Sequence, residues 1–75
     1  MDDKHILFLV GERIKLLRGK KGLSQQDLAD LCGFEKSNMS RIESGKSNLT
    51  IKTLNIIAIA LSVRISELLD IDKKC

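Results

Sequence analysis

The chain has 75 residues, of which 43% are hydrophobic and 31% are charged, with no proline and with two phenylalanines as its only aromatic residues. This length suffices for one domain and excludes two, and an aliphatic, proline-free composition favours an all-α helical bundle over a β-sandwich or barrel. The net charge of +3 permits a polyanionic partner without requiring one.

Cysteine usage and hydropathy exclude several classes of protein. The two cysteines, Cys32 and Cys75, are too few for a disulfide framework, and no further residues accompany them as zinc ligands. We therefore expect a reduced, cytoplasmic protein that holds no metal and no cofactor, and we assign no role to Cys75. The apolar run at residues 5–11 is too short to cross a bilayer and lacks the flanks of a signal peptide. We expect no membrane association and interpret this run as the buried start of a first helix.

Apolar residues three or four positions apart predict five short helices in a single domain, 1–75. The first should cover about residues 6–20 and end in a stretch rich in glycine and lysine. The second, about two turns long, should begin after Ser24 as its N-cap, with Asp27 completing a capping box, and should end at Gly33. The other three should cover about residues 36–44, 51–61 and 65–69.

The stretch from about residue 24 to 44 meets the physical requirements of a helix-turn-helix, in which two short helices cross steeply around a tight turn. Ala29 is small enough for a neighbouring helix to pass close above it, and Gly33 supplies the positive φ that the turn needs. The remaining inward positions are all apolar: Leu28, Cys32, Phe34, Met39 and Ile42. Seven positions therefore agree with this motif.

The second helix of this motif has a narrow apolar edge and a broad polar face. Only Met39 and Ile42 are apolar within it, and the rest of its surface consists of small polar groups and hydrogen-bond donors: Lys36, Ser37, Asn38, Ser40 and Arg41. A helix that is merely solvated would more typically carry paired Glu and Lys, whereas Ser and Asn are indifferent helix formers. The major groove of DNA is wide enough to admit a helix, and these side chains suit base edges. We interpret this segment as a recognition helix.

The stretch "GLSQQDLADLCGFEKSNMSRIESGKSNLTIKTLNIIAIALSV" resembles the DNA-binding domain of the lambda- and 434-repressor type, the xenobiotic-response-element family of regulators. The resemblance covers about residues 10–69 and implies a compact five-helix bundle that binds double-stranded DNA. Within that family, the chain length and the run "NLTIKTL" resemble the controller proteins of restriction–modification systems, which are small dimeric regulators.

The resemblance implies roles for individual residues. Base contacts are expected from the recognition helix and its flank: Glu35, Lys36, Ser37, Asn38 and Arg41. Phosphate contacts are expected from the start of the preceding helix and from the loop after the recognition helix: Ser24, Gln25, Ser40, Ser44, Lys46 and Asn48. Arg18 and Glu43 match a partly buried ion pair that links the first helix to the end of the third. The chain departs from the family at Glu35, where a capping Ser, Thr or Asp is usual, and at Ser62, where glycine is usual.

The fourth predicted helix has more apolar residues than one core stripe requires, because Ile56, Ile59 and Val63 fall on a second face. Such exposed aliphatic residues would be a liability unless they were covered. We therefore predict a homodimer that pairs through about residues 54–71, with an interface made of Ile56, Ile59, Val63, Ile65, Leu69 and Ile71. The distribution of charge also separates the part of the chain expected to bind DNA from the part expected to pair. Residues 11–52 carry nine Lys/Arg and five Asp/Glu, a difference of +4, whereas residues 53–75 carry three of each.

These features lead to one main functional hypothesis and several alternatives. The main one is a sequence-specific transcriptional regulator that binds a palindromic operator as a homodimer. The first alternative is an antitoxin, which would have the same fold, bind a toxin through the apolar seam and repress its own operon. The second is a module that binds proteins and not DNA. Asp27 and Asp30 either serve only solvation or form an acidic patch that touches RNA polymerase. We do not expect an enzyme, because the sequence offers no nucleophile–base pair, metal-ligand cluster or phosphate-binding glycine loop.

Overall fold

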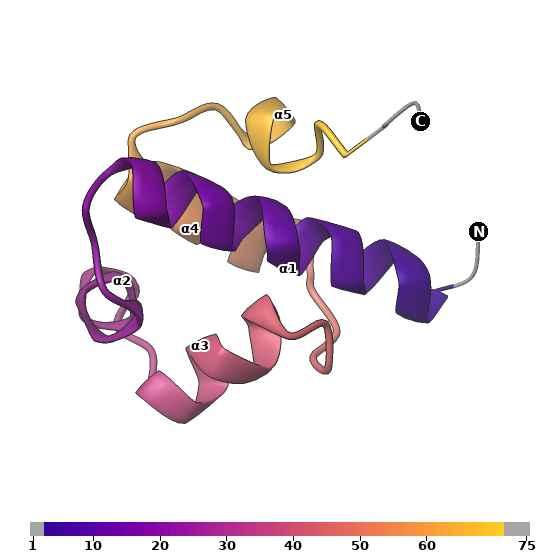
Figure 1. The fold of residues 1–75 in the computed structure, drawn as a ribbon, viewed down its shortest axis with the longest axis horizontal. Coiled ribbons are helices and arrows are strands. Elements are labelled where there is room, and N and C mark those ends of the chain that lie inside the picture. The colour runs from indigo at the N-terminus through magenta and orange to yellow at the C-terminus, as the bar shows by residue number, and fades with distance from the viewer. Residues whose placement is uncertain (1–2, 72–75) are drawn as a thin grey trace.

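The computed structural model describes residues 3–71, which form five α-helices and no β-strand (Figure 1). The helices are α1 (Asp3–Lys20), α2 (Gln25–Cys32), α3 (Lys36–Glu43), α4 (Ile51–Leu61) and α5 (Ile65–Leu68). The prediction of an all-α bundle of five helices is confirmed. None of the helices within the described range combines the length and apolarity that a membrane crossing would require. Cys75 lies outside the described residues.

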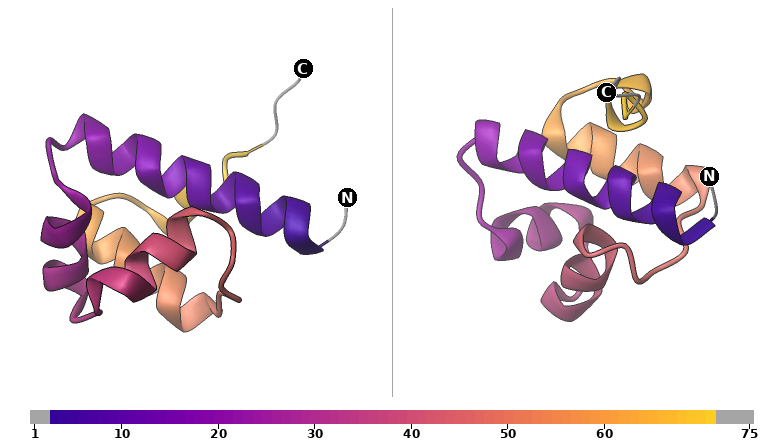
Figure 2. Two further views of the ribbon diagram at one scale, coloured as in Figure 1. Left: turned by 60° about the horizontal axis from the view of Figure 1, so that its bottom comes forward. Right: turned by 45° about the vertical axis from the view of Figure 1, so that its right-hand side comes forward.

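The helices are arranged around α1 and α4, with α5 on one side and the pair α2 and α3 on the other (Figures 1 and 2). All five helices contribute side chains to one aliphatic core. Its buried members are Val10, Ile14, Leu17, Leu28, Ala29, Met39, Ile42, Leu54, Ile57, Ala58, Leu61 and Leu68. The inward residues expected for the helix-turn-helix therefore reach this core, with Cys32 and Phe34 half-buried against it.

Side-chain caps fix where α2 and α4 begin. Ser24 Oγ accepts a hydrogen bond of 2.9 Å from the backbone N–H of Asp27, whose carboxylate accepts one of 2.9 Å from the N–H of Ser24. Hydrogen bonding from Ser24, first of all from its backbone N–H, lowers the pKa of Asp27 below its ordinary value, because it favours the charged carboxylate. The hydroxyl of Thr50 accepts from the N–H of Thr53 at 3.1 Å and starts α4 in the same way. Both capped helix starts therefore follow from the local sequence.

The start of α1 differs from the sequence-based expectation. The helix begins at Asp3, about three residues early, and its first turns are not buried, since Ile6 is 36% exposed and Phe8 is 47% exposed. The helix extends here beyond the core, whose first member along the chain is Val10. Two smaller differences concern helix ends, because α3 stops at Glu43 and α5 at Leu68, each one residue before the predicted end.

The chain reverses direction after α4 by a left-handed residue that is not glycine. Ser62 has φ 58° and ψ 41°, and its N–H donates to the carbonyl of Ile59 at 3.0 Å. The N–H of Val63 donates to the carbonyl of Ala58 at 3.0 Å, which completes a Schellman motif. This motif folds Val63 back onto the end of α4, so Val63 is half-buried against the core.

Two glycines bring α1 into backbone contact with α3 and the loop after it. A Cβ atom placed on Gly11 would lie 2.6 Å from the carbonyl oxygens of both Ile42 and Glu43. A Cβ atom on Gly45, whose φ is +78°, would lie 2.7 Å from the Cα of Phe8. Both views in Figure 2 show the loop after α3 starting next to the N-terminal half of α1. Because backbone atoms cannot move aside as a side chain does, these contacts fix the end of α3 against α1.

We predict that Gly11→Ala destabilises the protein by about 1–3 kcal/mol, because the new methyl group overpacks the contact between α1 and α3. Gly19→Ala is the matched control. Gly19 also lies in α1, but nothing stands within 4 Å of its added Cβ, so the better helix propensity of alanine should raise stability by up to about 1 kcal/mol. Urea unfolding of the two variants should therefore give changes of opposite sign, and equal effects would contradict the packing argument.

Candidate nucleic-acid interface

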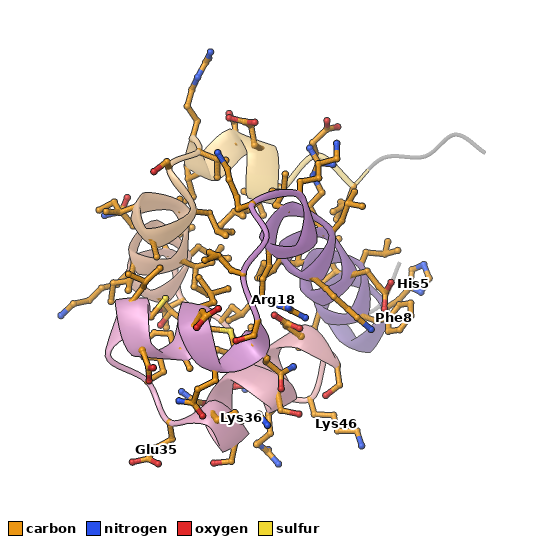
Figure 3. All side chains as sticks on the ribbon, turned by 60° about the vertical axis from the view of Figure 1, so that its left-hand side comes forward. His5, Phe8, Arg18, Glu35, Lys36 and Lys46 are labelled. Carbon is orange, nitrogen blue, oxygen red and sulfur yellow. The ribbon has the colours of Figure 1, made fainter. Side chains whose placement is uncertain are left out.

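Helix α3 is held to the protein along one edge and exposes the rest of its surface. Met39 is 0% exposed and Ile42 is 2% exposed, and both belong to the core. The remaining polar side chains of the helix are all exposed except Glu43: Lys36, Ser37, Asn38, Ser40 and Arg41. In Figure 3 the labelled Glu35 and Lys36 side chains point away from the body of the molecule. This face is therefore open to a ligand as large as a nucleic-acid duplex.

The first turn of α3 lacks a side-chain cap. Glu35 occupies the N-cap position with an extended backbone, yet its carboxylate makes no capping hydrogen bond. The N–H groups of this turn thus have no side-chain acceptor at the cap, and the Glu35 side chain is exposed beside Lys36. Helix α3 consequently depends on its later residues for attachment.

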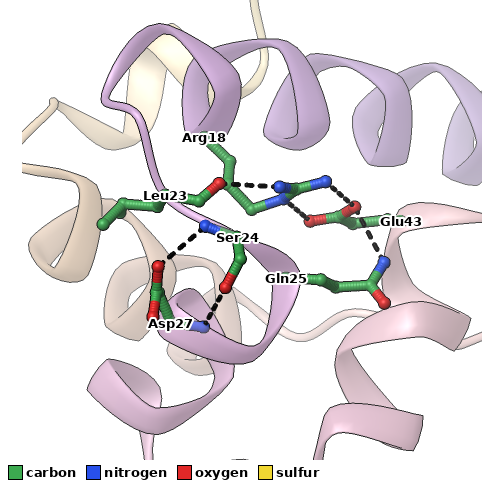
Figure 4. Close-up of polar contacts among 6 residues, drawn as sticks. All are labelled: Arg18, Leu23, Ser24, Gln25, Asp27 and Glu43. Carbon is green, nitrogen blue, oxygen red and sulfur yellow. Dashed lines mark hydrogen bonds and ion pairs between the residues drawn. The ribbon is translucent and has the colours of Figure 1, made fainter.

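That attachment is a buried ion pair at the end of the helix (Figure 4). Arg18 Nε donates to Glu43 Oε2 at 2.7 Å, and Arg18 Nη2 donates to Glu43 Oε1 at 3.1 Å. The side chains of Arg18 and Glu43 are only 14% and 3% exposed. Arg18 Nη1 also donates to the carbonyl of Leu23 at 2.8 Å, and Gln25 Nε2 donates to Glu43 Oε1 at 3.1 Å. The cluster therefore joins α1, the loop before α2, the start of α2 and the end of α3.

Gln25 is thus a bracing residue in this structure. It is half-buried at the first position of α2, and its amide nitrogen is directed to Glu43. The adjacent Ser24 is exposed, and its Oγ already accepts the capping bond. Because a hydroxyl also carries a proton, Ser24 keeps a donor for a phosphate oxygen.

Arg41 also makes contacts within the protein that the sequence did not indicate. Its Nη2 donates to the carbonyl of Lys46 at 3.2 Å, and the N–H of Lys46 donates back to the carbonyl of Arg41 at 2.9 Å. The hydroxyl of Ser44 donates to the same Arg41 carbonyl at 3.2 Å. Arg41 therefore stabilises the loop after α3, while its other N–H donors stay on the exposed face. The loop residues expected to contact phosphate, Ser44, Lys46 and Asn48, are all exposed.

The residues expected in the dimer interface do not form one uniformly exposed face. Ile59 is 69% exposed and Leu69 is 44% exposed. The other four are half-buried: Ile56, Val63, Ile65 and Ile71. Of these, Val63, Ile65 and Ile71 pack against the core. The expectation that Ile56, Ile59 and Val63 are exposed together is therefore wrong for two of the three, and for Val63 the Schellman motif is the cause.

Several structural residues carry no recognisable signal in the sequence. Gly11 is one, because a glycine inside a helix reveals its role only when the neighbouring backbone is known. Arg13 is another, since its Nε donates to the carbonyl of Glu67 at 2.7 Å and its Nη2 lies 3.7 Å from Asp70 Oδ2. These contacts tie α1 to α5. The sequence also contains no indication that Phe8 and Lys15 line a hollow together with Gln25 and Ser40.

The described residues offer no second kind of site. No cluster of three His, Cys, Asp or Glu side chains that could hold a metal occurs among them. Cys32 is half-buried, and burial raises the pKa of its thiol, which disfavours the reactive thiolate.

Comparison with known proteins identifies a family and several similar proteins. The sequence model of the helix-turn-helix family matches residues 14–68. Control protein C.SmaI of Serratia marcescens is 35% identical over 69 residues, which cover 92% of this chain and 79% of that protein. The restriction–modification controller protein C.AhdI from Aeromonas hydrophila has a similar structure, with a TM-score of 0.80, 37% identity and coverage of 83% of this chain and 94% of that one. The biofilm regulator SinR in complex with DNA has a TM-score of 0.74, 39% identity and coverage of 81% and 98%.

We predict that Arg18→Ala costs about 3–5 kcal/mol of unfolding free energy, because it leaves the Glu43 carboxylate buried without its cation. Asp70→Ala is the matched control, since this carboxylate is 68% exposed and its surface pair with Arg13 contributes about 1 kcal/mol at most. The double variant Arg18→Met with Glu43→Leu removes both charges and should recover most of the loss. Thermal or urea unfolding compares the three, and equal effects of the two single variants would contradict this ranking.

Proposed function

The chain belongs to the helix-turn-helix family, and from that premise we propose that it is a transcriptional regulator that binds a palindromic operator in double-stranded DNA as a homodimer. The observation that carries the proposal is the exposed polar face of α3, which is anchored by only two buried apolar residues and a buried ion pair. A likeness of 39% identity to SinR, whose structure is a complex with DNA, supports the same ligand. The proposed activity is binding and not catalysis, and the cytoplasm is the proposed place of action.

Side-chain chemistry assigns roles on this surface. Arg41 can donate two hydrogen bonds to a guanine, Asn38 can pair with an adenine, and Lys36 makes a less directional contact. Ser37 can bind either kind of base, and Glu35 can accept from a cytosine amino group. The groups around this helix are proposed to hold the DNA backbone: Ser24, Gln25, Ser40, Ser44, Lys46 and Asn48. Backbone contacts fix the register, and base contacts supply the sequence preference.

We propose pairing through α4 and α5 because their exposed apolar residues are unusual for so small a protein. Ile59 and Leu69 are the exposed part of this surface, flanked by Ile56, Val63, Ile65 and Ile71. A two-fold axis here would present two copies of α3 about 34 Å apart, one turn of B-DNA, and would make the operator a palindrome. The similarity to the controller proteins C.SmaI and C.AhdI supports the narrower proposal that the regulated genes belong to a restriction–modification system.

A contact with RNA polymerase is proposed for the outer face of α2. Asp27 and Asp30 are exposed there, and they share a shallow hollow with Leu23 and Leu31, of which Leu31 is 60% exposed. Asp27 is already committed to the capping box, whereas Asp30 accepts only from Gln26 Nε2, at 2.8 Å. Asp30 and Leu31 are therefore the residues best able to contact a partner without loss of the helix cap.

We predict that Arg41→Ala weakens binding to the preferred operator by roughly 1–3 kcal/mol and removes the preference at one base position per half-site. Preferred sites would be selected from random duplex DNA for the wild type and for each variant. Arg41→Lys is the control, because it keeps a positive charge but loses the planar pair of donors. It should retain binding to random DNA and lose the same base preference. Unchanged preference at every position in both variants would contradict the role of Arg41.

We predict that Ile59→Lys converts the protein into a folded monomer, because a charged group at the centre of the apolar seam cannot be buried without a partner. Ile51→Lys is matched in exposure, since both isoleucines lie in α4 and both are 69% exposed, but Ile51 is outside the proposed seam. It should leave the dimer intact. Analytical ultracentrifugation distinguishes the outcomes, and a dimer that persists in Ile59→Lys would place the interface elsewhere.

A further inference from the structure

One face of α1 lines two hollows next to the residues proposed to hold the DNA backbone. The first, of about 300 Å³, lies between α1, α2 and α3 and is lined by Phe8, Glu12, Lys15, Gln25, Ser40, Glu43 and Ser44. The second, of about 540 Å³, is lined by Leu7, Phe8, Ser44, Gly45, Lys46 and Asn48. Phe8 and Ser44 belong to both, so the two hollows adjoin at these residues. In Figure 3 the labelled Lys46 lies between Lys36 and Phe8 along the lower edge of the molecule.

The position of Phe8 relative to the loop is fixed by the backbone. The Cα of Phe8 approaches Gly45 so closely that an added Cβ would lie 2.7 Å away, and Gly11 makes a similar contact with the end of α3. Phe8 is nevertheless 47% exposed, as one of the chain's two aromatic residues. The backbone of Phe8 is therefore held against the loop, while its large apolar ring lies partly exposed at the surface beside polar groups.

The charges around the two hollows taken together leave an excess of one cation, because Arg18, Lys15 and Lys46 face the two carboxylates Glu12 and Glu43. Lys15 is exposed and takes part in neither of the two ion pairs within residues 3–71. Ser40 adds a hydroxyl donor, whereas the hydroxyl of Ser44 already donates to the carbonyl of Arg41. The charge of Glu43 is compensated by Arg18. Glu12 is the one carboxylate in this hollow without such compensation. Lys46 supplies a second exposed cation in the adjoining hollow.

We propose that this face of α1 is a further part of the DNA-binding surface. Lys15 binds a phosphate in the first hollow together with the hydroxyl of Ser40, and Phe8 packs its ring against the deoxyribose that follows on the same strand. The next phosphate lies in the second hollow, against Lys46 and Asn48. The proposal rests on the function proposed above. It adds contacts to the backbone alone, so it predicts an effect on affinity for DNA of any sequence.

The test compares Lys15→Gln and Phe8→Ala with the wild type on operator DNA and on random duplex DNA over a range of salt concentrations. Loss of one phosphate contact should reduce the slope of log affinity against log salt by about 0.9 for each bound protomer of Lys15→Gln. Phe8→Ala should weaken binding to both duplexes by the same factor, roughly 3- to 10-fold, and leave the slope unchanged. Glu12→Gln should strengthen binding to both, because it removes the opposing charge.

Leu16→Ala is the matched control for Phe8→Ala. Leu16 is 50% exposed on the same helix, and it lines another hollow that shares only Glu12 with the first, so its truncation should leave DNA affinity unchanged. Circular dichroism and thermal unfolding would establish that each variant is folded, and the exposed Lys15 provides a substitution with little risk to the fold.

The outcomes separate this proposal from the proposed function. The role of α1 would be overturned if Lys15→Gln kept the wild-type salt slope and Phe8→Ala kept the wild-type affinity for DNA. In that case a loss of base preference in Arg41→Ala would still support the proposed function. A change of base preference in Lys15→Gln without a change of slope would also overturn the role of α1, because the residue would then act through the position of α3. If the wild type shows no salt-dependent binding to either duplex, both proposals fail.

Discussion

The buried ion pair between Arg18 and Glu43 is the interaction on which the position of α3 depends. Removing two charges from water is costly, and the cost is offset here by two hydrogen bonds within the pair and by further bonds to Leu23 and Gln25. No side-chain nitrogen or oxygen that is buried in the described part of the chain lacks a hydrogen-bond partner. A fully satisfied pair of this kind allows one orientation of α3, whereas an apolar contact alone would tolerate small rotations.

The backbone contacts at Gly11 and Gly45 complement the ion pair. The pair sets the direction of α3, and the glycines set its distance from α1, since a Cβ atom at either position would meet backbone atoms at 2.6–2.7 Å. The same arrangement brings the first turns of α1 to the edge of the polar surface. On the other side of the molecule, a hydrogen bond from Arg13 to the carbonyl of Glu67 links α1 to α5. Helix α1 therefore connects α3 and the loop after it to α5.

Local patterns in the sequence account for the helices but not for most contacts between them. The starts of α2 and α4 follow from Ser24 and Thr50, and the end of α2 follows from Gly33, because caps act within a few residues. The pairing of Arg18 with Glu43 came from the family resemblance and not from spacing. The bond from Arg41 to the Lys46 carbonyl, the half-buried state of Val63 and the exposure of Phe8 depend on how chain segments meet in space. No periodicity in one dimension encodes them.

Helix α3 separates the side chains that hold it from those that face outward. Met39, Ile42 and Glu43 attach it, while its exposed positions carry Ser and Asn, which contribute little to helix stability, and its N-cap adds no side-chain bond. The stability of α3 thus comes from tertiary contacts and not from its exposed sequence. Substitutions at Lys36, Ser37 or Asn38 can therefore change what the surface recognises at little cost to the fold. Arg41 is the exception, because its guanidinium also bonds the carbonyl of Lys46, so the base contact proposed for it depends on the shape of the loop proposed to hold the DNA backbone.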